Sequence, residues 1–368
     1  MKSIFELKKT ADNSSFKNPD FYVKLAFTIL FVAFFIISFF ALNGYEYFYS
    51  TVYADEFKGF DFQVHAIDVG QGDCFLIKLP SNKCMLIDAG EEEYSYKVSE
   101  YIRQFLNAEK LSGIDYVVLT HPDGDHIGGA RQIIREFEVA TLFRPPVYSY
   151  SESKMPEING EFAVDLSLIY DNTINCAYEN GLEIKFFEQG DKLDFYGCTA
   201  EFLSPSNNTG ASNDLSAVIM FCWQNKKFLF MGDAESNIEQ QLINQYGEKL
   251  KADVLKVGHH GSITSSSQEF IQYVNPSYAI ISSGGNSKYF PNPTVLTRLE
   301  SQGAKVLSTA KEGNFVVSVA NSSIIYSKAS RPPNHVALIF SIVLIMVLIV
   351  WENPFKNHKA LYFTKKAS

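Results

Sequence analysis

Two long apolar runs without charged residues, one near each end of the chain, constrain its architecture most. The 368-residue sequence reads LAFTILFVAFFIISFFAL at residues 25–42 and VALIFSIVLIMVLIVW at residues 336–351. A helix needs about 20 consecutive apolar residues to cross a bilayer. The first run approaches this length and the second is a little shorter, so both are predicted to be transmembrane helices that flank one large body.

The placement of lysines predicts how these two helices are oriented. Five lysines lie within residues 1–24 and four within residues 352–368, which form two basic tails. Positive residues accumulate on the cytoplasmic side of a membrane. Both tails are therefore expected in the cytoplasm, with the protein in the cell membrane. A linker at residues 43–60 and a domain at residues 61–328 are expected to be extracytoplasmic.

A cleaved signal peptide is the alternative interpretation of the first apolar run. Val52-Tyr53-Ala54 could serve as a small-residue cleavage site. However, the run is longer than the roughly 7–15 residues of a signal peptide's apolar region. An uncleaved anchor is therefore the preferred interpretation, and the expected topology barely depends on the choice.

The body between the two runs is acidic. The chain holds 41 acidic and 32 basic residues, a formal net charge of −9, and nine of the lysines belong to the tails. Duplex nucleic acid is bound chiefly through basic surface that neutralises phosphates, so no extended duplex-binding surface is expected. The five cysteines form no CxxC pair, which excludes a zinc ribbon.

Short apolar runs separated by glycine-rich turns make up the body. Strands are expected where the runs alternate or are wholly apolar, and helices where apolar residues recur every three or four positions. Both kinds mix in each half of the body, which two facing sheets with helices outside would satisfy. A turn at Gln224-Asn225 is expected to join two of the strands. Residues 149–180 are polar and irregular, and are expected to form an insertion or lid.

The segment THPDGDHIGG at residues 120–129 concentrates groups that bind metals. Four potential ligands alternate along it: His121, Asp123, Asp125 and His126. This alternation lets two of them face one ion while the other two serve a neighbouring ion. A solvated DGD turn is the simpler alternative. A calcium loop of EF-hand type would need further acids at alternate positions, and Ile127 with the two glycines interrupts that series.

Further potential ligands follow other predicted strands. Asp233 ends FLFMGD, and His259 and His260 follow DVLKVG. Imidazole and carboxylate ligands suit zinc, manganese or iron, and two such ions about 3.5–4 Å apart can share an activated water. Asp233 is then the expected bridging ligand, and one histidine of the pair is an expected ligand. Asp88, which ends CMLID, is expected to support the ligand loops by accepting hydrogen bonds.

Eight segments occur in the same order as in the metallo-β-lactamase-fold domain of ComEC-type competence proteins, which the chain resembles over nearly all of residues 62–320. They read IDVGQGDCFLI, MLIDAG, LTHPDGDHIGGA, SNDLSAVI, FLFMGDAE, VLKVGHHGS, YAIISSGGN and PNPTVLTRLESQGAKV. The resemblance implies an α/β fold, a four-layer αββα sandwich, and a metal-dependent hydrolase similar to nucleases or phosphodiesterases. It implies metal ligands at His121, Asp123, Asp125, His126, Asp233 and one of His259 and His260, of which His260 is preferred. The wider superfamily usually has histidine at position 123, so an aspartate there resembles the competence branch.

Two features depart from that family. The chain has two predicted spans, so no many-span channel is expected within it. A His-Pro-His-Pro run that often precedes the family's last helix reads FPNP here, with Phe290 and Asn292 at the histidine positions. The contacts to the substrate are therefore expected to differ more than the metal ligands.

These features combine into the expectation of a membrane-anchored hydrolase that acts on a phosphodiester or nucleic acid. It would use water activated by two divalent ions, zinc or manganese. Asp125 is expected to orient that water, and His259 and Ser262 to contact the leaving group or an anionic oxygen. Residues expected to support the ligands or to line the substrate are Asp68, Gln71, Asp73, Asp88, Asn213, Tyr289 and Asn292. The alternatives are another ester or β-lactam hydrolase of the same fold, and a non-catalytic metal-bound sensor or scaffold in the membrane.

Overall fold

A computed structural model describes residues 59–155, 163–165, 167–204, 212–285 and 289–328, together with Leu30, Phe31 and Phe34. The described residues from 59 to 328 belong to one compact unit of the chain, residues 50–329. The two predicted membrane spans lie outside the described residues, except for the three isolated positions. Within the described part of the chain, no helix combines the length and the apolar character that a membrane crossing requires.

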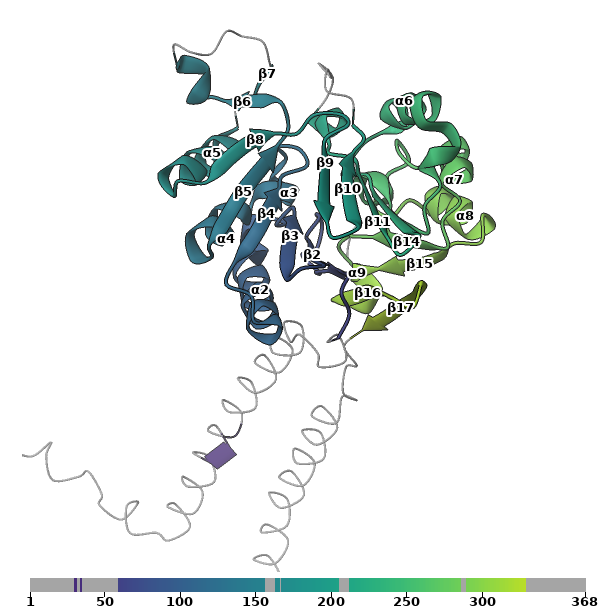
Figure 1. Ribbon diagram of the computed structural model, residues 1–368, viewed down its shortest axis with the longest axis horizontal. Helices are drawn as coiled ribbons and strands as arrows, with labels where there is room; N and C mark the ends of the chain where they lie inside the picture. Colours follow the sequence, from purple (N-terminus) through teal and green to yellow (C-terminus); the bar gives the residue numbers. More distant parts are fainter. Residues whose placement is uncertain are drawn as a thin grey trace, which may run out of the picture. The chain divides into compact units, whose positions relative to one another are not determined.

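One sheet of eight strands contains the first strands of the domain and its last two (Figure 1). In spatial order these are β17 (Ser323–Lys328), β16 (Phe315–Ala320), β1 (Gln63–Ala66), β2 (Phe75–Leu79), β3 (Lys83–Ile87), β4 (Ile114–Val118), β5 (Val139–Arg144) and β8 (Glu183–Phe186). The strands from β17 to β3 pair antiparallel, and β3, β4, β5 and β8 pair in parallel. Because parallel strands end at the same edge, the loop after β4 lies at an edge suited to ligand binding.

A second sheet of seven strands faces the first. Its order is β15 (Lys305–Ser308), β14 (Tyr278–Ile281), β13 (Val254–Lys256), β12 (Lys226–Phe230), β11 (Ile219–Trp223), β10 (Cys198–Phe202) and β9 (Lys192–Phe195). The strands β12 to β15 pair in parallel. The expected turn at Gln224-Asn225 is confirmed, with φ of 49° and 63°. Both values are left-handed, as a two-residue hairpin turn requires.

Helices cover the outer face of each sheet (Figure 1). The first sheet is covered by α2 (Ser95–Glu109), α4 (Ala130–Glu136) and α5 (Leu168–Glu179). The second is covered by α6 (Ser236–Tyr246), α7 (Gln268–Val274) and α8 (Pro293–Ser301). Shorter elements are α3 (Gly124–Ile127), α9 (Thr309–Glu312), the two-stranded sheet of β6 (Val147–Ser149) and β7 (Ala163–Asp165), and the 3-10 helices η3 (Glu92–Tyr94), η4 (Glu152–Lys154), η5 (Ser212–Leu215), η6 (Gly247–Leu250) and η7 (Gly258–Gly261).

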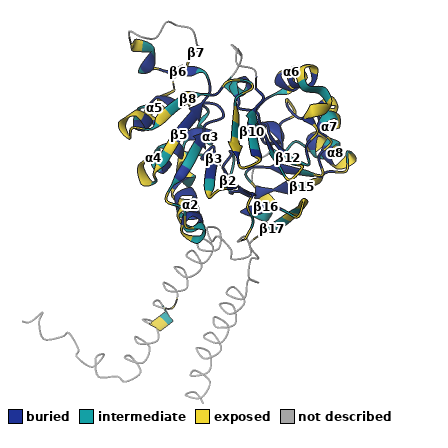
Figure 2. Ribbon diagram, viewed as in Figure 1, coloured by how far each residue is buried: buried dark blue, intermediate teal, exposed yellow. Residues whose placement is uncertain are grey.

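Three apolar clusters hold the four layers together. Successive residues of a strand point to opposite faces, so Phe75 and Ile77 of β2 pack between the sheets while Leu76 packs beneath the helices of the first sheet. On the far side of the second sheet, Leu255 packs with Phe270 of α7. Figure 2 shows the strands buried and the outward faces of the helices exposed. The expected α/β fold with two facing sheets is thus confirmed.

The prediction that residues 149–180 are irregular is wrong for part of that segment. Helix α5 occupies its second half and is capped by Ser167, whose side chain accepts a hydrogen bond from the N–H of Tyr170. Tyr170 and Ile174 are buried in the core of the first sheet. Leu168 and Ile169 are exposed, and these apolar residues outside the buried face obscure the helical period of the sequence.

Candidate metal centre

The expected ligands meet at strand ends of both sheets. The loop after β4 carries residues 121–126 and is called the metal-ligand loop below. The loop after β12 carries Asp233, and the loop after β13 carries His259 and His260. Asp73 joins them from the turn before β2. Residues that are 134 positions apart, such as His126 and His260, thereby come into direct contact.

Four side chains converge on one point. His126 Nε2 lies 3.3 Å from His260 Nε2 and 3.3 Å from Asp233 Oδ2. His260 Nε2 lies 3.2 Å from Asp233 Oδ2 and 3.3 Å from Asp125 Oδ2. Ligand atoms about 2.1 Å from a tetrahedral ion are about 3.4 Å from one another. The four separations given above are close to that value, so the group fits a divalent ion, and nitrogen with oxygen donors suits zinc or manganese.

Both histidines are oriented by acceptors on their other ring nitrogen. His126 Nδ1 donates to Asp88 Oδ2 over 2.7 Å, and His260 Nδ1 donates to the carbonyl oxygen of Ser282 over 2.9 Å. Asp88 also accepts hydrogen bonds from the N–H and hydroxyl of Thr120, which is the supporting position expected for it. Metal-binding histidines are commonly held in this way, because a donor bond at one nitrogen leaves the other free for the ion.

Asp73 contacts the same two histidines, but on the side of their Nδ1 atoms and not of their Nε2 atoms. Its ligand atom lies within 4.8 Å of those of His126, Asp233 and His260. However, its oxygens are 3.5 Å from His260 Nδ1 and 3.9 Å from His126 Nδ1, the nitrogens that face away from the shared point. We therefore place Asp125, and not Asp73, among the four converging side chains.

Lys256 explains what Asp73 does instead. This lysine is 1% exposed and its ammonium forms an ion pair with Asp73. It also lies 3.5 Å from Asp233 Oδ1 and donates to the carbonyl oxygen of Gly232 over 2.7 Å. Lys256 was not among the residues expected at this centre. The available signal was a single charged residue inside the apolar strand VLKV, just before the histidine pair.

The buried charges shift one another's pKa values. Burial lowers the pKa of His126 and of His260, but the nearby carboxylates, above all Asp233, hold both well above the usual value. Burial raises the pKa of Asp233, yet the two histidines and Lys256 hold it well below its usual value. These contacts favour the protonated form of both histidines in the metal-free protein. A metal ion must displace those protons, so metal affinity rises with pH.

His121 and Asp123 form a second pair beside this point. His121 is fully buried, and its Nε2 has no hydrogen-bond partner among the described residues. This nitrogen lies 3.6 Å from Asp123 Oδ2. The hydroxyl of Ser212 donates to Asp123 Oδ1 over 2.6 Å and holds the carboxylate in place. A buried ring nitrogen without a partner calls for an explanation, and a second metal ion ligated by this pair would provide one.

His259 lies outside the four converging side chains. Its Nε2 is 4.0 Å from Asp233 Oδ2, and its Nδ1 is 3.1 Å from Glu235 Oε1. Asn213 Nδ2 donates to the same Glu235 oxygen over 3.3 Å. The His259 side chain is 23% exposed, compared with 1% for His260. His260 is thus the histidine at the centre, and His259 is the one that a substrate can reach.

Three further predicted residues lie near the histidine pair. Ser262 follows it in the chain, and Tyr289 and Asn292 lie on the loop before α8. Ser262 shares a hydrogen bond of 2.9 Å with the hydroxyl of Thr264, so it belongs to the network of Glu235 and not to the four converging side chains. Asn292 caps α8 by accepting a hydrogen bond from the N–H of Thr294 over 2.9 Å. Tyr289 is 76% exposed.

The remaining predicted residues shape the turn before β2. Asp68 pairs with Lys97 over 3.5 Å, and the amide oxygen of Gln71 is buried without a hydrogen-bond partner in the described part of the chain. Gly72 has a φ of +125°, and a Cβ there would overlap the carbonyl oxygen of Asp125. Glycine is required at this position because the turn lies directly against the metal-ligand loop.

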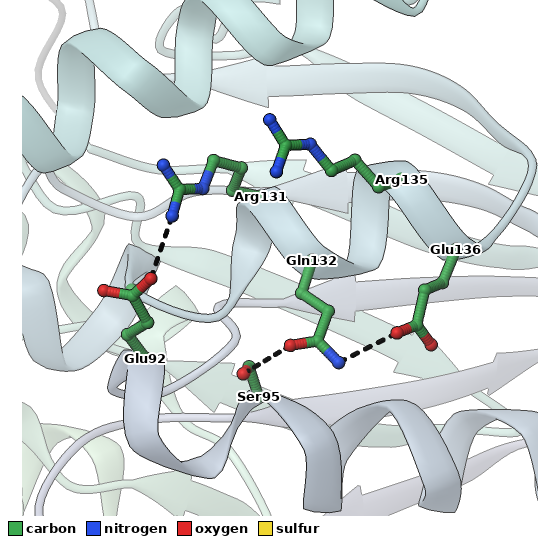
Figure 3. A pocket seen from close by; sticks show the side chains of 7 residues that line it. Glu92, Ser95, Arg131, Gln132, Arg135 and Glu136 are labelled. Atoms are coloured by element: carbon green, nitrogen blue, oxygen red, sulfur yellow. Dashed lines mark hydrogen bonds and ion pairs between the residues drawn. The ribbon is translucent and has the colours of Figure 1, made fainter.

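A surface groove of about 200 Å³ lies along α4, between this helix and the residues Glu92 and Ser95 (Figure 3). Its polar side chains bond to one another: Arg131 pairs with Glu92 over 2.9 Å, and Gln132 links Ser95 to Glu136. The lining residues are Glu92, Ser95, Gly128, Arg131, Gln132, Arg135 and Glu136. None of them is a predicted ligand, so the groove is separate from the metal centre.

The sequence match decides the family. The model of the metallo-beta-lactamase superfamily matches residues 67–285, the stretch that contains every converging side chain. The chain belongs to the metallo-beta-lactamase superfamily. An α/β sandwich with histidine and aspartate side chains converging at its strand ends agrees with that membership.

This superfamily member is similar to three bacterial proteins. ComE operon protein 3 of Bacillus subtilis (strain 168) is 32% identical over 270 residues, which cover 69% of this chain and 32% of that protein. Recombination protein 2 of Haemophilus influenzae is 33% identical, and the matched residues cover 69% of this chain and 28% of that protein. Competence protein ComA of Neisseria gonorrhoeae is 31% identical, and the matched residues cover 67% of this chain and 30% of that protein. The resemblance to ComEC-type competence proteins is confirmed, and the chain spans about 30% of the length of these relatives.

Proposed function

We propose that the chain is a metal-dependent phosphodiesterase, nuclease-like and anchored in the cell membrane. One observation carries the proposal. His126 and His260 donate hydrogen bonds from Nδ1 to Asp88 and to the carbonyl oxygen of Ser282, respectively. Their Nε2 atoms are thereby directed to the carboxylates of Asp233 and Asp125. Membership of the superfamily supports a metal-dependent hydrolase. Relatives named for competence and recombination support a nucleic-acid substrate.

The ligand set divides between two ions. Asp125, His126, Asp233 and His260 would hold one ion, and His121 with Asp123 would contribute to the other. Zinc or manganese, when bound, would lower the pKa of water and polarise a phosphoryl oxygen. Asp88 and Ser282 keep each ligand histidine in one tautomer and one orientation, so the protein does not have to reorganise when a metal arrives.

His259 is the residue placed to act on the leaving group. It is partly exposed, and Glu235 accepts a hydrogen bond from its Nδ1 over 3.1 Å. This bond orients the ring so that its Nε2 is the nitrogen left for the substrate. His259 would then donate a hydrogen bond or a proton to the oxygen that departs from the phosphorus atom.

A metal-dependence assay tests the proposal. The full chain, purified in detergent and stripped of metal, is supplied with zinc or manganese. It is then given bis-p-nitrophenyl phosphate, a single-stranded oligonucleotide and a chromogenic β-lactam. Phosphodiester cleavage is expected only with added metal. His260→Ala and Asp233→Ala are expected to reduce it at least about 100-fold, because each removes a ligand. The exposed Glu188→Gln serves as the control and is expected to match the wild-type chain.

Metal content, measured by mass spectrometry on the same samples, separates the alternatives. A chain that binds metal but turns over no substrate would be a sensor or scaffold. Cleavage of the β-lactam without cleavage of either phosphodiester would identify a β-lactam hydrolase. Absence of bound metal in the wild-type chain would refute the enzyme proposal altogether.

A further inference from the structure

An aromatic side chain lies directly on the two histidines of the site. The ring centroid of Phe290 is 5.3 Å from that of His259, with an angle of 35° between the planes. It is 6.1 Å from the ring of His260, which it meets edge to face at 75°. Phe290 thus presents an apolar ring beside both histidines.

The backbone around Phe290 fixes the ring in this place. The N–H of Asn292 donates to the carbonyl oxygen of Gly261 over 2.8 Å. Gly261 has a φ of +82°, and a Cβ there would lie 2.9 Å from the Cβ of Pro291. Asn292 in turn caps α8. The loop before α8 is therefore attached to the residue that follows the histidine pair, and the ring cannot move away without breaking this contact.

A second aromatic residue extends the same surface outward. Tyr289 precedes Phe290 in the chain and is 76% exposed, whereas Phe290 is partly buried. Two adjacent aromatic residues thus lead from the solvent to the histidines. A ring that packs on such a surface is stabilised by stacking, which tolerates any nucleobase because every base has a π-face.

The described charges around the centre do not favour a polyanion. Asp123 and Glu235, which border the centre, are acidic, with side chains 44% and 29% exposed. Lys256 is buried and paired with Asp73 and Asp233. A substrate would therefore gain little from pairing its phosphates with these groups, and contacts to its uncharged parts become more important for binding.

We propose that Tyr289 and Phe290 form a stacking subsite that takes the nucleobase adjoining the scissile phosphodiester. The inference rests on the proposed function, because it assumes that a phosphodiester reaches the centre. It names the substrate class more closely: a single-stranded nucleic acid, whose unpaired bases are free to stack, and not a duplex or a simple sugar phosphate.

The experiment compares substrates with and without a base at the cleaved bond. The metal-loaded full chain is given one of two substrates. One is a fluorescein-labelled thymidine oligonucleotide, and the other is the same oligonucleotide with abasic sites flanking one phosphodiester. The kcat/KM of the wild-type chain is expected to be on the order of 10-fold higher for the intact oligonucleotide. In Tyr289→Ala and in Phe290→Leu, which keeps an apolar side chain of similar size, this ratio is expected to fall towards 1. Tyr196→Ala is the matched control, because Tyr196 is 86% exposed in the turn between β9 and β10. Its ratio is expected to stay at the wild-type value.

Binding provides a readout without turnover. Fluorescence anisotropy in EDTA measures the affinity for the intact and the abasic oligonucleotide, and the same loss of preference is expected in Tyr289→Ala and Phe290→Leu. If both variants slow the intact and abasic substrates by equal factors, Phe290 only positions His259 and the subsite does not exist. If the wild-type chain cleaves both oligonucleotides equally well, the inference is wrong while the proposed function stands. If it cleaves neither, both are wrong.

Discussion

At the scale of single residues, Lys256 decides how the charges of the metal centre are balanced. It is buried between Asp73 and Asp233, and these contacts hold its pKa above the usual value although burial lowers it. The lysine therefore keeps its charge. In the metal-free protein it offsets the repulsion between the carboxylates, and in the metal-loaded protein it adds a positive charge near the ion.

Lys256→Met is expected to destabilise the metal-free protein by about 3 kcal/mol, because two buried carboxylates lose their counter-charge. Zinc should recover more of this stability in the variant than in the wild-type chain, since the ion replaces the missing positive charge and binds only the folded state. Urea denaturation with EDTA and with zinc measures both quantities. Lys226→Met is the control, because Lys226 pairs with Asp253 at a partly exposed position. A zinc-induced gain no larger than that of the wild-type chain would contradict this role.

At the scale of structural elements, a buried ion pair ties residues 149–180, the segment predicted to be an insertion and called the insertion below, to the first sheet. Arg144, at the end of β5, contacts both carboxylate oxygens of Glu152 over 2.7 Å and 2.6 Å, and the two side chains are 3% and 2% exposed. The hydroxyl of Tyr178 on α5 donates to the same carboxylate over 2.8 Å. The Ile169 side chain at the start of α5 lies close to Gly124 of the metal-ligand loop. The ion pair thus positions the helix that covers this loop.

Glu152→Gln is expected to lower the free energy of unfolding by about 3 kcal/mol, because Arg144 remains buried without a counter-charge. Hydrogen exchange should become faster in α5 and unchanged in the second sheet. The exposed Glu179→Gln on the same helix is the control. Equal protection of α5 in both variants would show that the pair does not hold the insertion.

The same pair should make the insertion sensitive to acid. Burial raises the pKa of Glu152, but Arg144, together with hydrogen bonds from Ser149 and Tyr178, holds it below the ordinary value of 4.5. A carboxyl group with a lowered folded-state pKa contributes its full stability above the ordinary value. That contribution disappears as the pH falls through the lowered value, and the Glu152→Gln variant should lack this part of the wild-type pH dependence.

At the scale of the whole molecule, the predicted topology places an acidic hydrolase domain outside the cytoplasm. The two membrane spans and their orientation remain predictions, since both apolar runs lie outside the described residues except for Leu30, Phe31 and Phe34. The buried residues of the three apolar clusters of the described domain lie between residues 62 and 319.

A reporter that is active only outside the cytoplasm, inserted near Ser151 at the start of the insertion, is expected to be active. The same reporter attached after Ser368 is expected to be inactive, because the positive residues of the tail retain it in the cytoplasm. Activity at both positions would indicate that the second run does not cross the membrane. Inactivity at both would refute the extracytoplasmic location of the domain.

The local pattern of the sequence was sufficient for most of the fold and for the metal-ligand loops. Strands such as β2 and β4 are apolar runs bounded by turns, and their ends are visible as the first polar residues that follow. Ligands at His126, Asp233 and one of His259 and His260 were predicted in this way, because a polar residue at a strand end is a local feature of the chain. The helix α5 was not, since its exposed apolar residues hide the helical period.

The pairing of distant residues could be obtained only from the folded chain. Asp73 and Lys256 are 183 positions apart and meet because the turn before β2 and the strand β13 reach the centre from different sheets. The same holds for the choice between the two histidines: both follow β13, but only His260 has Ser282 as an acceptor that turns its Nε2 towards Asp233. Local propensity carries no information about such contacts, because they depend on the register and the packing of strands that the sequence separates.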